Sequence, residues 1–439
     1  MVKFTVRWPC DKQSRSKLIK SADHCCRKGI ARLYYSLCEN EMVRFTCIIF
    51  TLGCCLCAFL LWLFIRDPCS KYSITKALCQ EYKNGLAAGR MCYDLCYEDS
   101  VYLSCLAEDE ETSTFSWKDT IVKASKQRKK LNDHTEPSSN EVWEGMTLEE
   151  FVKKLEDFFT VQLGPGDHSM LIDRVLNFAD FNGDAEFLFG EINSMWKLLH
   201  KPEFLTILIF SKHPVFPYLN DTCSDMYAYE NIRTQVLYDK SDTSWLSRMF
   251  SDSYRWNFPP WLRRVQISVG LLEFISVVLE EANTRFYMCN LSPTKFGFTN
   301  TFQMKVTSLH GITSEEKLKI ALSQKKCLTD SDCTIGQICH SKCDIKRQVC
   351  SEDILSLDIV EVCRILVDYI FFDAPSKLKA MLKIFVTKCS SLHYSHNSYN
   401  NSQVDINHNL LIDDLIAILW DQIKDQSTKW FKNEPIKTL

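Results

Sequence analysis

Oxygen-bearing side chains between residues 180 and 191 have the spacing of a calcium-binding loop. Asp180, Asn182 and Asp184 stand at loop positions 1, 3 and 5, and Glu191 stands at position 12, where calcium loops use a bidentate carboxylate. Glu186 at position 7 would contribute its backbone carbonyl oxygen. Because Ca²⁺ prefers oxygen ligands in this arrangement, the stretch predicts a calcium site.

A calcium loop of this kind needs a helix on each side to position it. Apolar residues recur at helical spacing on both flanks, so we expect a helix–loop–helix unit. The apolar positions are Leu171, Val175 and Phe178 before the loop and Ile192, Met195, Trp196 and Leu199 after it.

Two residues depart from the calcium-loop pattern. Ala185 stands at position 6, where glycine is usual because the backbone turns sharply with positive φ. A Cβ in that conformation costs on the order of 1 kcal/mol. Leu188 at position 9 has no side-chain oxygen, so water or backbone would have to serve. We therefore expect a weakened site, and the alternative is an acidic loop that holds no ion.

The tract from Phe286 to Leu309 has the layout of a phosphoryl-transfer loop without the side chains that this chemistry uses. We expect it to form a helix end, a loop, a strand, a turn and a strand. A protein kinase carries here an Asp that accepts a proton, an Asn five residues later that binds metal, and a second metal-binding Asp after the next strand. Asn290, Lys295 and Ser308 occupy those positions. An amide does not accept a proton near neutral pH, and neither an ammonium nor a hydroxyl replaces an oxygen ligand of Mg²⁺ well.

The tracts Met288–Asn290 and Met304–Val306 resemble the divergent protein kinase domain 1 family, and the resemblance covers about residues 69 to 430. It implies a bilobal protein-kinase fold in a cysteine-rich membrane protein of the endoplasmic reticulum. Where that family has Cys-Asp and then Asn five residues later, this chain has Asn290 and Lys295. The departure argues against catalysis more than against the fold.

Within this resemblance, Lys123 and Glu203 match the Lys–Glu pair that a kinase places at its nucleotide. The stretch Trp117–Ala124 is similar to the kinase Val-Ala-Ile-Lys strand, and Glu203 precedes an apolar helical run that leads into His213. We therefore pair Lys123 with Glu203 and expect a cleft that could hold ATP or another nucleotide. No glycine-rich phosphate loop is present in the sequence, and the alternative is that both residues are simply exposed.

The long stretch between Lys123 and Glu203 predicts an insertion in the smaller lobe, and the calcium loop lies inside it. Outside the short strand, residues 107–141 combine an acidic run and a basic run and predict mostly solvated linker. The apolar stretch Trp261–Glu281 predicts one buried helix. Further helices are expected at 353–369, 378–386 and 410–423, with a polar loop at 390–409.

The cysteine count predicts an oxidising compartment. The chain has 22 cysteines, and an even number of them follows residue 66, which favours a disulfide framework whose connectivity the spacing does not fix. Zinc is the rival explanation for the cluster at 327–350, where His340 lies beside Cys339 and Cys343, but paired Cys-x-x-Cys motifs are missing. The cysteines after residue 66 are Cys69, Cys79, Cys92, Cys96, Cys105, Cys223, Cys289, Cys327, Cys333, Cys339, Cys343, Cys350, Cys363 and Cys389.

Residues 45–65 form an uncharged apolar run of the length that a helix needs to cross a bilayer. The preceding residues 1–44 are rich in Lys and Arg, which predicts a cytosolic tail and a lumenal chain after the span. A cleaved signal peptide is the alternative, but its apolar core would be shorter and nearer the amino terminus. Glycosylation motifs at Asn220 and Asn400 agree with a lumenal location.

These observations predict an α+β fold, a bilobal protein-kinase-like domain with disulfide staples and an EF-hand-like insertion, preceded by one transmembrane helix. The net charge of −3 argues against nucleic acid as a partner. We expect a pseudokinase of the secretory pathway that responds to calcium and binds or regulates a client protein. The alternatives are an active kinase or nucleotide transferase with a rewired site, and a structural calcium-binding ectodomain. The expected parts are a cytosolic tail (1–44), a signal anchor (45–65), a cysteine-rich module (66–106), a small lobe (107–230) with the insertion near 168–200, and a large lobe (231–439).

Overall fold

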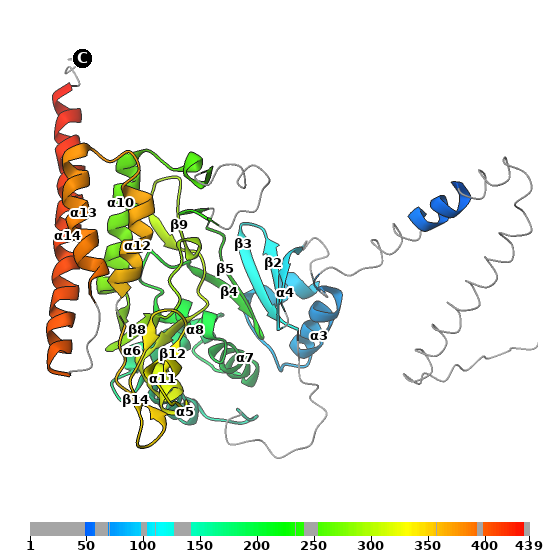
Figure 1. Ribbon diagram of the computed structural model, residues 1–439. Helices are drawn as coiled ribbons and strands as arrows, with labels where there is room; N and C mark the ends of the chain where they lie inside the picture. The colour runs from blue at the N-terminus through cyan, green and yellow to red at the C-terminus, as the bar shows by residue number, and fades with distance from the viewer. Residues whose placement is uncertain are drawn as a thin grey trace, which may run out of the picture. The chain divides into compact units, whose positions relative to one another are not determined.

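The chain divides into two compact units, Met1–Pro68 and Cys69–Leu439. In the second unit, strands β2 to β5 with helices α3 and α4 lie at one end, and helices α10, α12, α13 and α14 lie at the other (Figure 1). The computed structural model describes residues 49–57, 69, 71–97, 103–109, 111–126, 142–232, 234–240, 253–356, 358–392 and 398–433.

Only part of the predicted membrane span lies within the described residues. Residues 49–57 are helical, while the rest of 45–65 and the basic tail lie outside the described residues. Among the described residues, no helix is both long enough and apolar enough to cross a bilayer.

A five-stranded antiparallel sheet with the order β1-β2-β3-β5-β4 forms the small lobe. This corrects the prediction of a solvated linker at residues 107–141, because the segment up to Ser125 forms most of β1 to β3; residues 127–141 lie outside the described chain. The alternation of Thr112–Trp117, with every second side chain buried, is the strand pattern that the neighbouring charge runs obscured. The strands are β1 (Ser104–Glu108), β2 (Thr112–Trp117), β3 (Thr120–Ser125), β4 (Leu219–Cys223) and β5 (Met226–Glu230).

Two cysteine-bearing helices, α3 (Lys71–Lys83) and α4 (Arg90–Tyr97), pack on this sheet. Ile74 and Leu78 of α3 share one apolar core with Phe115 of β2. The cysteine-rich segment and the sheet are therefore one folded body, which the predicted disulfides reinforce. The pairs are Cys69–Cys105, Cys79–Cys96 and Cys92–Cys223.

In the described part of the chain between β3 and β4 there are four helices, of which the first three lie in the insertion predicted between Lys123 and Glu203. The first begins at Thr147, whose side chain accepts a hydrogen bond from the backbone of Glu150 while the Glu150 carboxylate accepts one from Thr147. The second and third flank residues 180–188, where the sequence predicts the calcium loop. The helices are α5 (Leu148–Leu163), α6 (Ser169–Ala179), α7 (Phe189–Leu199) and α8 (Pro202–Ile209).

The large lobe begins differently from the predicted single helix at Trp261–Glu281. Helix α10 ends at Glu273, a π-helix follows, and Glu280–Glu281 form strand β7. Ala282 and Asn283 both have positive φ, as in a two-residue hairpin turn, so the chain returns as β8 and Phe286 lies in a strand instead of at a helix end. The elements are α10 (Trp261–Glu273), β6 (Gln235–Val236), β8 (Thr284–Met288), β9 (Phe296–Phe298), β10 (Met304–Val306) and β11 (Ile312–Ser314).

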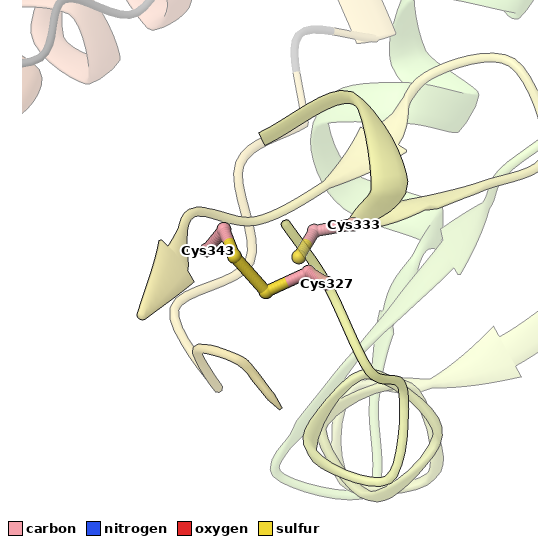
Figure 2. A group of neighbouring side chains, drawn as sticks. All are labelled: Cys327, Cys333 and Cys343. Atoms are coloured by element: carbon pink, nitrogen blue, oxygen red, sulfur yellow. A yellow bond between two sulfur atoms is a disulfide. The ribbon is translucent and has the colours of Figure 1, made fainter. Parts of the chain in front are cut away.

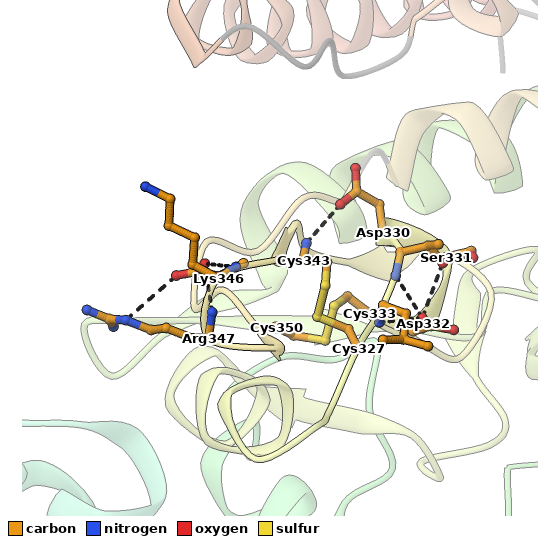
Figure 3. The surroundings of a disulfide bond; sticks show 12 residues. Cys327, Asp330, Ser331, Asp332, Cys333, Cys343, Lys346, Arg347 and Cys350 are labelled. Atoms are coloured by element: carbon orange, nitrogen blue, oxygen red, sulfur yellow. Dashed lines mark hydrogen bonds and ion pairs between the residues drawn. A yellow bond between two sulfur atoms is a disulfide. The ribbon is translucent and has the colours of Figure 1, made fainter.

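The late cysteine cluster is a disulfide framework, as predicted, in short strands that follow α11 (Glu315–Ser323). Figure 3 shows the bridges Cys327–Cys343 and Cys333–Cys350 side by side. The sulfur of Cys333 lies beside the first bridge (Figure 2), and the three sulfurs fall within 4.8 Å of one another because two disulfides adjoin. Cys339 is bonded to Cys289, so neither Cys339 nor Cys343 offers a thiolate and the zinc alternative is wrong for this oxidised chain. The strands are β12 (Thr334–Ile335), β13 (Cys339–His340), β14 (Cys343–Asp344) and β15 (Val349–Cys350).

Three helices close the large lobe, and α13 and α14 run side by side (Figure 1). The polar loop predicted at 390–409 is wrong in its second half, because α14 already begins at Ser398. Where the burial of its residues is described, this polar helix carries a buried stripe that includes His408, Ile412 and Leu415. The helices are α12 (Asp358–Ile370), α13 (Ser376–Ser390) and α14 (Ser398–Asn433), with Cys363–Cys389 joining the first two.

Candidate functional site in the cleft between the lobes

Lys123 and Glu203 form an ion pair between β3 and α8. Tyr227 donates a hydrogen bond from its hydroxyl to the same Glu203 oxygen, Oε2, at 3.1 Å. The pairing of Lys123 with Tyr227 across β3 and β5 explains this, because directly opposed residues of an antiparallel pair share one face of the sheet. The two residues that the sequence pairs are therefore in contact, and a role in nucleotide binding stays a prediction.

A cavity of about 200 Å³ opens beside this ion pair. Its lining includes Lys123, Glu203 and Ser308 but neither Asn290 nor Lys295. Its acidic side chains are Glu203, which is neutralised by Lys123, and Glu230 at the end of β5. The lining residues are Ile121, Lys123, Glu203, Pro217, Tyr229, Glu230, Ile232, Thr234, Val306, Thr307, Ser308 and Leu309.

Two tyrosines near the ion pair were not recognised as site residues from the sequence. Burial raises the pKa of Tyr227, and the negative charge of Glu203 raises it further, so its hydroxyl stays a neutral donor. Burial and Glu203 raise the pKa of Tyr229 in the same way, and its ring lines the cavity. The alternation of residues 226–230 is the available signal, but only the strand register sets Tyr227 opposite Lys123 and Tyr229 opposite Ile121.

Lys295 bridges the two segments from which a kinase supplies its metal ligands. It ends the 3-10 helix Pro293–Lys295, which Ser292 caps. Its Nζ donates a hydrogen bond to the carbonyl oxygen of His310 at 3.2 Å, just beyond Ser308. Burial lowers the pKa of Lys295. A cationic side chain thus joins segments that in a kinase meet around a divalent metal ion.

Asn290 is exposed near the beginning of the loop that follows β8. The residue before it, Cys289, is bonded to Cys339, and the backbone N–H of Gln337 donates to the Cys289 carbonyl oxygen at 2.6 Å. Gly336 lies so close to that carbonyl that an added Cβ would clash at 2.2 Å. The cysteine cluster therefore packs directly on the loop in which Asn290 occupies the position of the kinase proton acceptor.

The turn between β1 and β2 is acidic where a kinase has its glycine-rich phosphate loop. Its sequence is Asp109-Glu110-Glu111, and Glu108 at the end of β1 pairs with Lys126 at 2.9 Å. Thr112 opposes Ser125, so the turn lies at the end of β3 beyond Lys123 and away from the segment that follows β5. A phosphate chain that reached past Lys123 would approach like charge.

The predicted calcium loop is closed by hydrogen bonds to its own side chains. Asp180 Oδ1 accepts hydrogen bonds from the backbone N–H groups of Gly183 and Asp184, at 2.8 and 3.1 Å. Asp184 Oδ1 accepts one from the Glu186 N–H at 2.8 Å. Gly183 and Ala185 have φ values of 73° and 60°, so the sharp turn expected at position 6 is made in spite of the Cβ.

Glu191, the predicted bidentate ligand, is buried with a relative exposure of 3%. Its Oε2 accepts a hydrogen bond from the Leu188 N–H at 2.9 Å, whereas its buried Oε1 has no partner among the described residues. Burial raises the pKa of Glu191, and the charges of Asp184 and Asp180 raise it further. Among the described residues, the carboxylates of Asp180, Asp184 and Glu191 do not converge into one cluster, so an ion would have to draw them together.

Comparison with known protein families covers most of the chain. A family model described as the protein-kinase domain of FAM69 matches residues 195–392. A second model, described as the cysteine-rich endoplasmic-reticulum region at the N-terminus of FAM69, matches residues 34–177. The kinase-like lobes, the disulfides and these matches agree, and the chain belongs to the FAM69 family, the divergent protein kinase domain 1 family.

Proposed function

We propose that this kinase-like protein is a pseudokinase of the secretory pathway that binds or regulates a client protein in response to calcium. The observation that carries the proposal is the replacement of the proton acceptor and both metal-binding residues by Asn290, Lys295 and Ser308. Positioning and electrostatic stabilisation supply nearly all of a kinase's rate, and their loss removes several kcal/mol of barrier lowering. The cysteine cluster packed on Cys289 supports the same conclusion.

Nucleotide binding at Lys123 and Glu203 is a separate part of the proposal, and the cleft favours weak binding without a metal ion. The cavity of about 200 Å³ is smaller than most ligand pockets, which range over roughly 300–1,000 Å³. Ile232 follows β5 at the cavity. Its backbone N–H donates to the Glu230 carbonyl oxygen at 3.0 Å and is not free for a ligand. The acidic β1–β2 turn also disfavours a triphosphate.

The test of inactivity uses the purified full-length chain with ATP and Mg²⁺, Mn²⁺ or Ca²⁺, together with a panel of secretory proteins. We expect no phosphate or nucleotide transfer above the background of the Lys123→Ala variant. Metal-dependent transfer that Lys123→Ala abolishes would establish the alternative, an active transferase with a rewired site.

Calcium binding is supported by the loop spacing and by the buried, unpartnered Oε1 of Glu191. An unpaired buried carboxylate oxygen is costly, and a bound cation is the partner that loop position 12 normally provides. We expect calcium to raise the thermal unfolding temperature of the wild-type protein and to leave that of Glu191→Gln unchanged. A calcium response without any response to nucleotide would favour the structural ectodomain over the nucleotide-binding pseudokinase.

The proposed topology is a single-pass type II membrane protein with residues 66–439 in the lumen of the endoplasmic reticulum. The disulfides of the second unit support an oxidising compartment, and the family description supports the endoplasmic reticulum. Protease treatment of sealed microsomes should remove the basic tail alone. Digestion of the disulfide-bonded unit in sealed microsomes would contradict this topology.

A further inference from the structure

Helix α8, which carries Glu203, follows the exit helix of the predicted calcium loop after two residues. Glu191 lies in the first turn of α7, and only His200 and Lys201 separate the end of α7 from Pro202, the first residue of α8. The connection is tight, because the Lys201 N–H donates to the Leu198 carbonyl oxygen at 2.9 Å. A shift of α7 is therefore transmitted to the start of α8.

The same connection is fastened to the sheet that carries Lys123. Lys201 Nζ donates hydrogen bonds to Ser125 Oγ at 2.6 Å and to the Asp225 carbonyl oxygen at 2.5 Å. Ser125 ends β3, two residues after Lys123, and Asp225 lies in the turn between β4 and β5. Lys201 thus sets the distance between the start of α8 and the strand that faces it.

The entry helix of the calcium loop holds the opposite end of α8. Arg174 of α6 donates from Nη1 to the Ile209 carbonyl oxygen at 2.6 Å, where α8 ends. Its Nη2 donates to Glu281 of the large lobe at 3.2 Å, and Glu281 also contacts His213 Nε2 at 3.1 Å. Burial raises the pKa of Glu281, but the hydrogen bonds from His213 and Arg174 and the nearby positive charge outweigh burial and lower it, so the Glu281 carboxylate is ionised. The two helices that flank residues 180–191 are therefore connected to both ends of α8, α7 to its start and α6 to its end.

We propose that calcium in the 180–191 loop and the Lys123–Glu203 ion pair are energetically coupled through α7, Lys201 and α8, so that each stabilises the other. This inference rests on the proposed calcium site and adds a regulation of the cleft. Bidentate ligation recruits both oxygens of Glu191, including the one without a partner, and so fixes the first turn of α7. The ion pair and the calcium-type turn at Gly183 and Ala185 coexist in this structure. Because this first turn leads through the Lys201 connection into α8, fixing it favours the arrangement in which Glu203 contacts Lys123.

Coupling between two sites is reciprocal, so it can be measured from the calcium side alone. We would titrate calcium into the full-length oxidised protein by isothermal titration calorimetry and compare wild type with Glu203→Gln and Lys123→Met. Both variants break the ion pair and are expected to weaken calcium binding about fivefold or more, the lower end of typical allosteric coupling. Lys240→Met is the matched control, because it breaks an ion pair with Asp368 in the large lobe; its calcium affinity should stay within about twofold of wild type.

The outcomes separate the two proposals. Wild-type protein that binds no calcium overturns the calcium site of the proposed function, and the coupling with it. Calcium binding of unchanged affinity in Glu203→Gln and Lys123→Met overturns the coupling alone. A second measurement needs no variant in the cleft: calcium should slow amide hydrogen exchange across Phe204–Ile209 in wild type but not in Glu191→Gln. Equal exchange with and without calcium in a calcium-bound wild type would also overturn the coupling.

Discussion

Lys295 Nζ and the His310 carbonyl oxygen lie 3.2 Å apart in a hydrogen bond that spans the loop after β8 and the segment after β10. The contact is reinforced by the backbone, where the Thr307 N–H donates to the Lys295 carbonyl oxygen at 2.8 Å. A kinase holds the same two segments together through a divalent ion and its ligands. In this chain the ammonium group of Lys295 makes the connection in place of a metal ion.

This substitution of an ammonium for a metal site predicts that metal binding can be restored. The double variant Lys295→Asn with Ser308→Asp removes the cation and supplies oxygen ligands from both segments, so we expect it to bind Mn²⁺ with millimolar affinity. Isothermal titration calorimetry measures this, and wild type should show no binding in the cleft. Ser308→Asp alone is the control, because Lys295 would neutralise the new carboxylate. Equal Mn²⁺ binding by the single and double variants would show that Lys295 does not occupy the metal position.

The unpartnered oxygen of Glu191 predicts an unusual pH dependence in the absence of calcium. A carboxyl group with a raised pKa keeps its proton in the folded state over a pH range in which the unfolded chain has lost it. The free energy of unfolding should therefore fall as the pH rises from the ordinary glutamate pKa through the raised one. Glu191→Gln should remove this decline and stabilise the calcium-free protein by about 1 kcal/mol at neutral pH. Urea denaturation in chelator at several pH values measures both effects.

The control for Glu191 is Glu186→Gln in the same loop, because Glu186 is exposed and would use its backbone oxygen for calcium. That variant should keep both the pH dependence and the calcium response. Two results would contradict the assignment of these effects to the buried carboxyl group of Glu191. One is loss of the pH dependence or of the calcium response in Glu186→Gln, and the other is a wild-type protein whose free energy of unfolding does not fall as the pH rises.

The backbone of the predicted calcium loop predicts opposite effects at two neighbouring positions. Ala185 has φ 60° and Gly183 has φ 73°, and a Cβ at Gly183 would meet open space, so strain alone distinguishes the residues. Ala185→Gly should stabilise the protein and Gly183→Ala should destabilise it, each by about 1 kcal/mol. Calcium affinity should change in the same directions by about fivefold. Shifts of the same sign in both variants, measured by calorimetry, would refute this account.

Patterns with a fixed period made much of this structure predictable. The helices around residues 180–191 follow from apolar spacing, and the helix with Glu203 follows from the stripe Phe204–Leu208. The disulfides among the cysteines after residue 66 agree with the prediction from their even number. The match of Lys123 to Glu203 came from a resemblance, because nothing local links a strand to a helix 80 residues away.

The parts that sequence reasoning missed depend on partners distant in the chain. Thr284–Met288 is a strand because it pairs with Ile312–Ser314, and the acidic residues around the β1–β2 turn hid the pairing of β1 with β2 and of β2 with β3. Tyr227 joined the site only through the register that sets it opposite Lys123. The beginning of α14 was missed because residues 398–409 are mostly polar, and the buried residue described there, His408, is itself polar. Tertiary packing outweighs local propensity at each of these positions.

Arg264 of α10 connects this helix to the end of α12 in the large lobe. It is 2% exposed, and its Nη1 and Nη2 donate to the carbonyl oxygens of Tyr369 and Phe372, at 2.6 and 2.9 Å, where α12 ends. Burial lowers the pKa of Arg264 because it disfavours the charged guanidinium group. The two carbonyl oxygens and the C-terminal end of α12 offset this desolvation cost. Arg264→Met should lower the free energy of unfolding by about 3 kcal/mol, because it leaves two carbonyl oxygens without donors. Arg263→Met, an exposed neighbour on the same helix, should change it by less than about 0.5 kcal/mol in the same urea titration, and equal losses in the two variants would contradict this role.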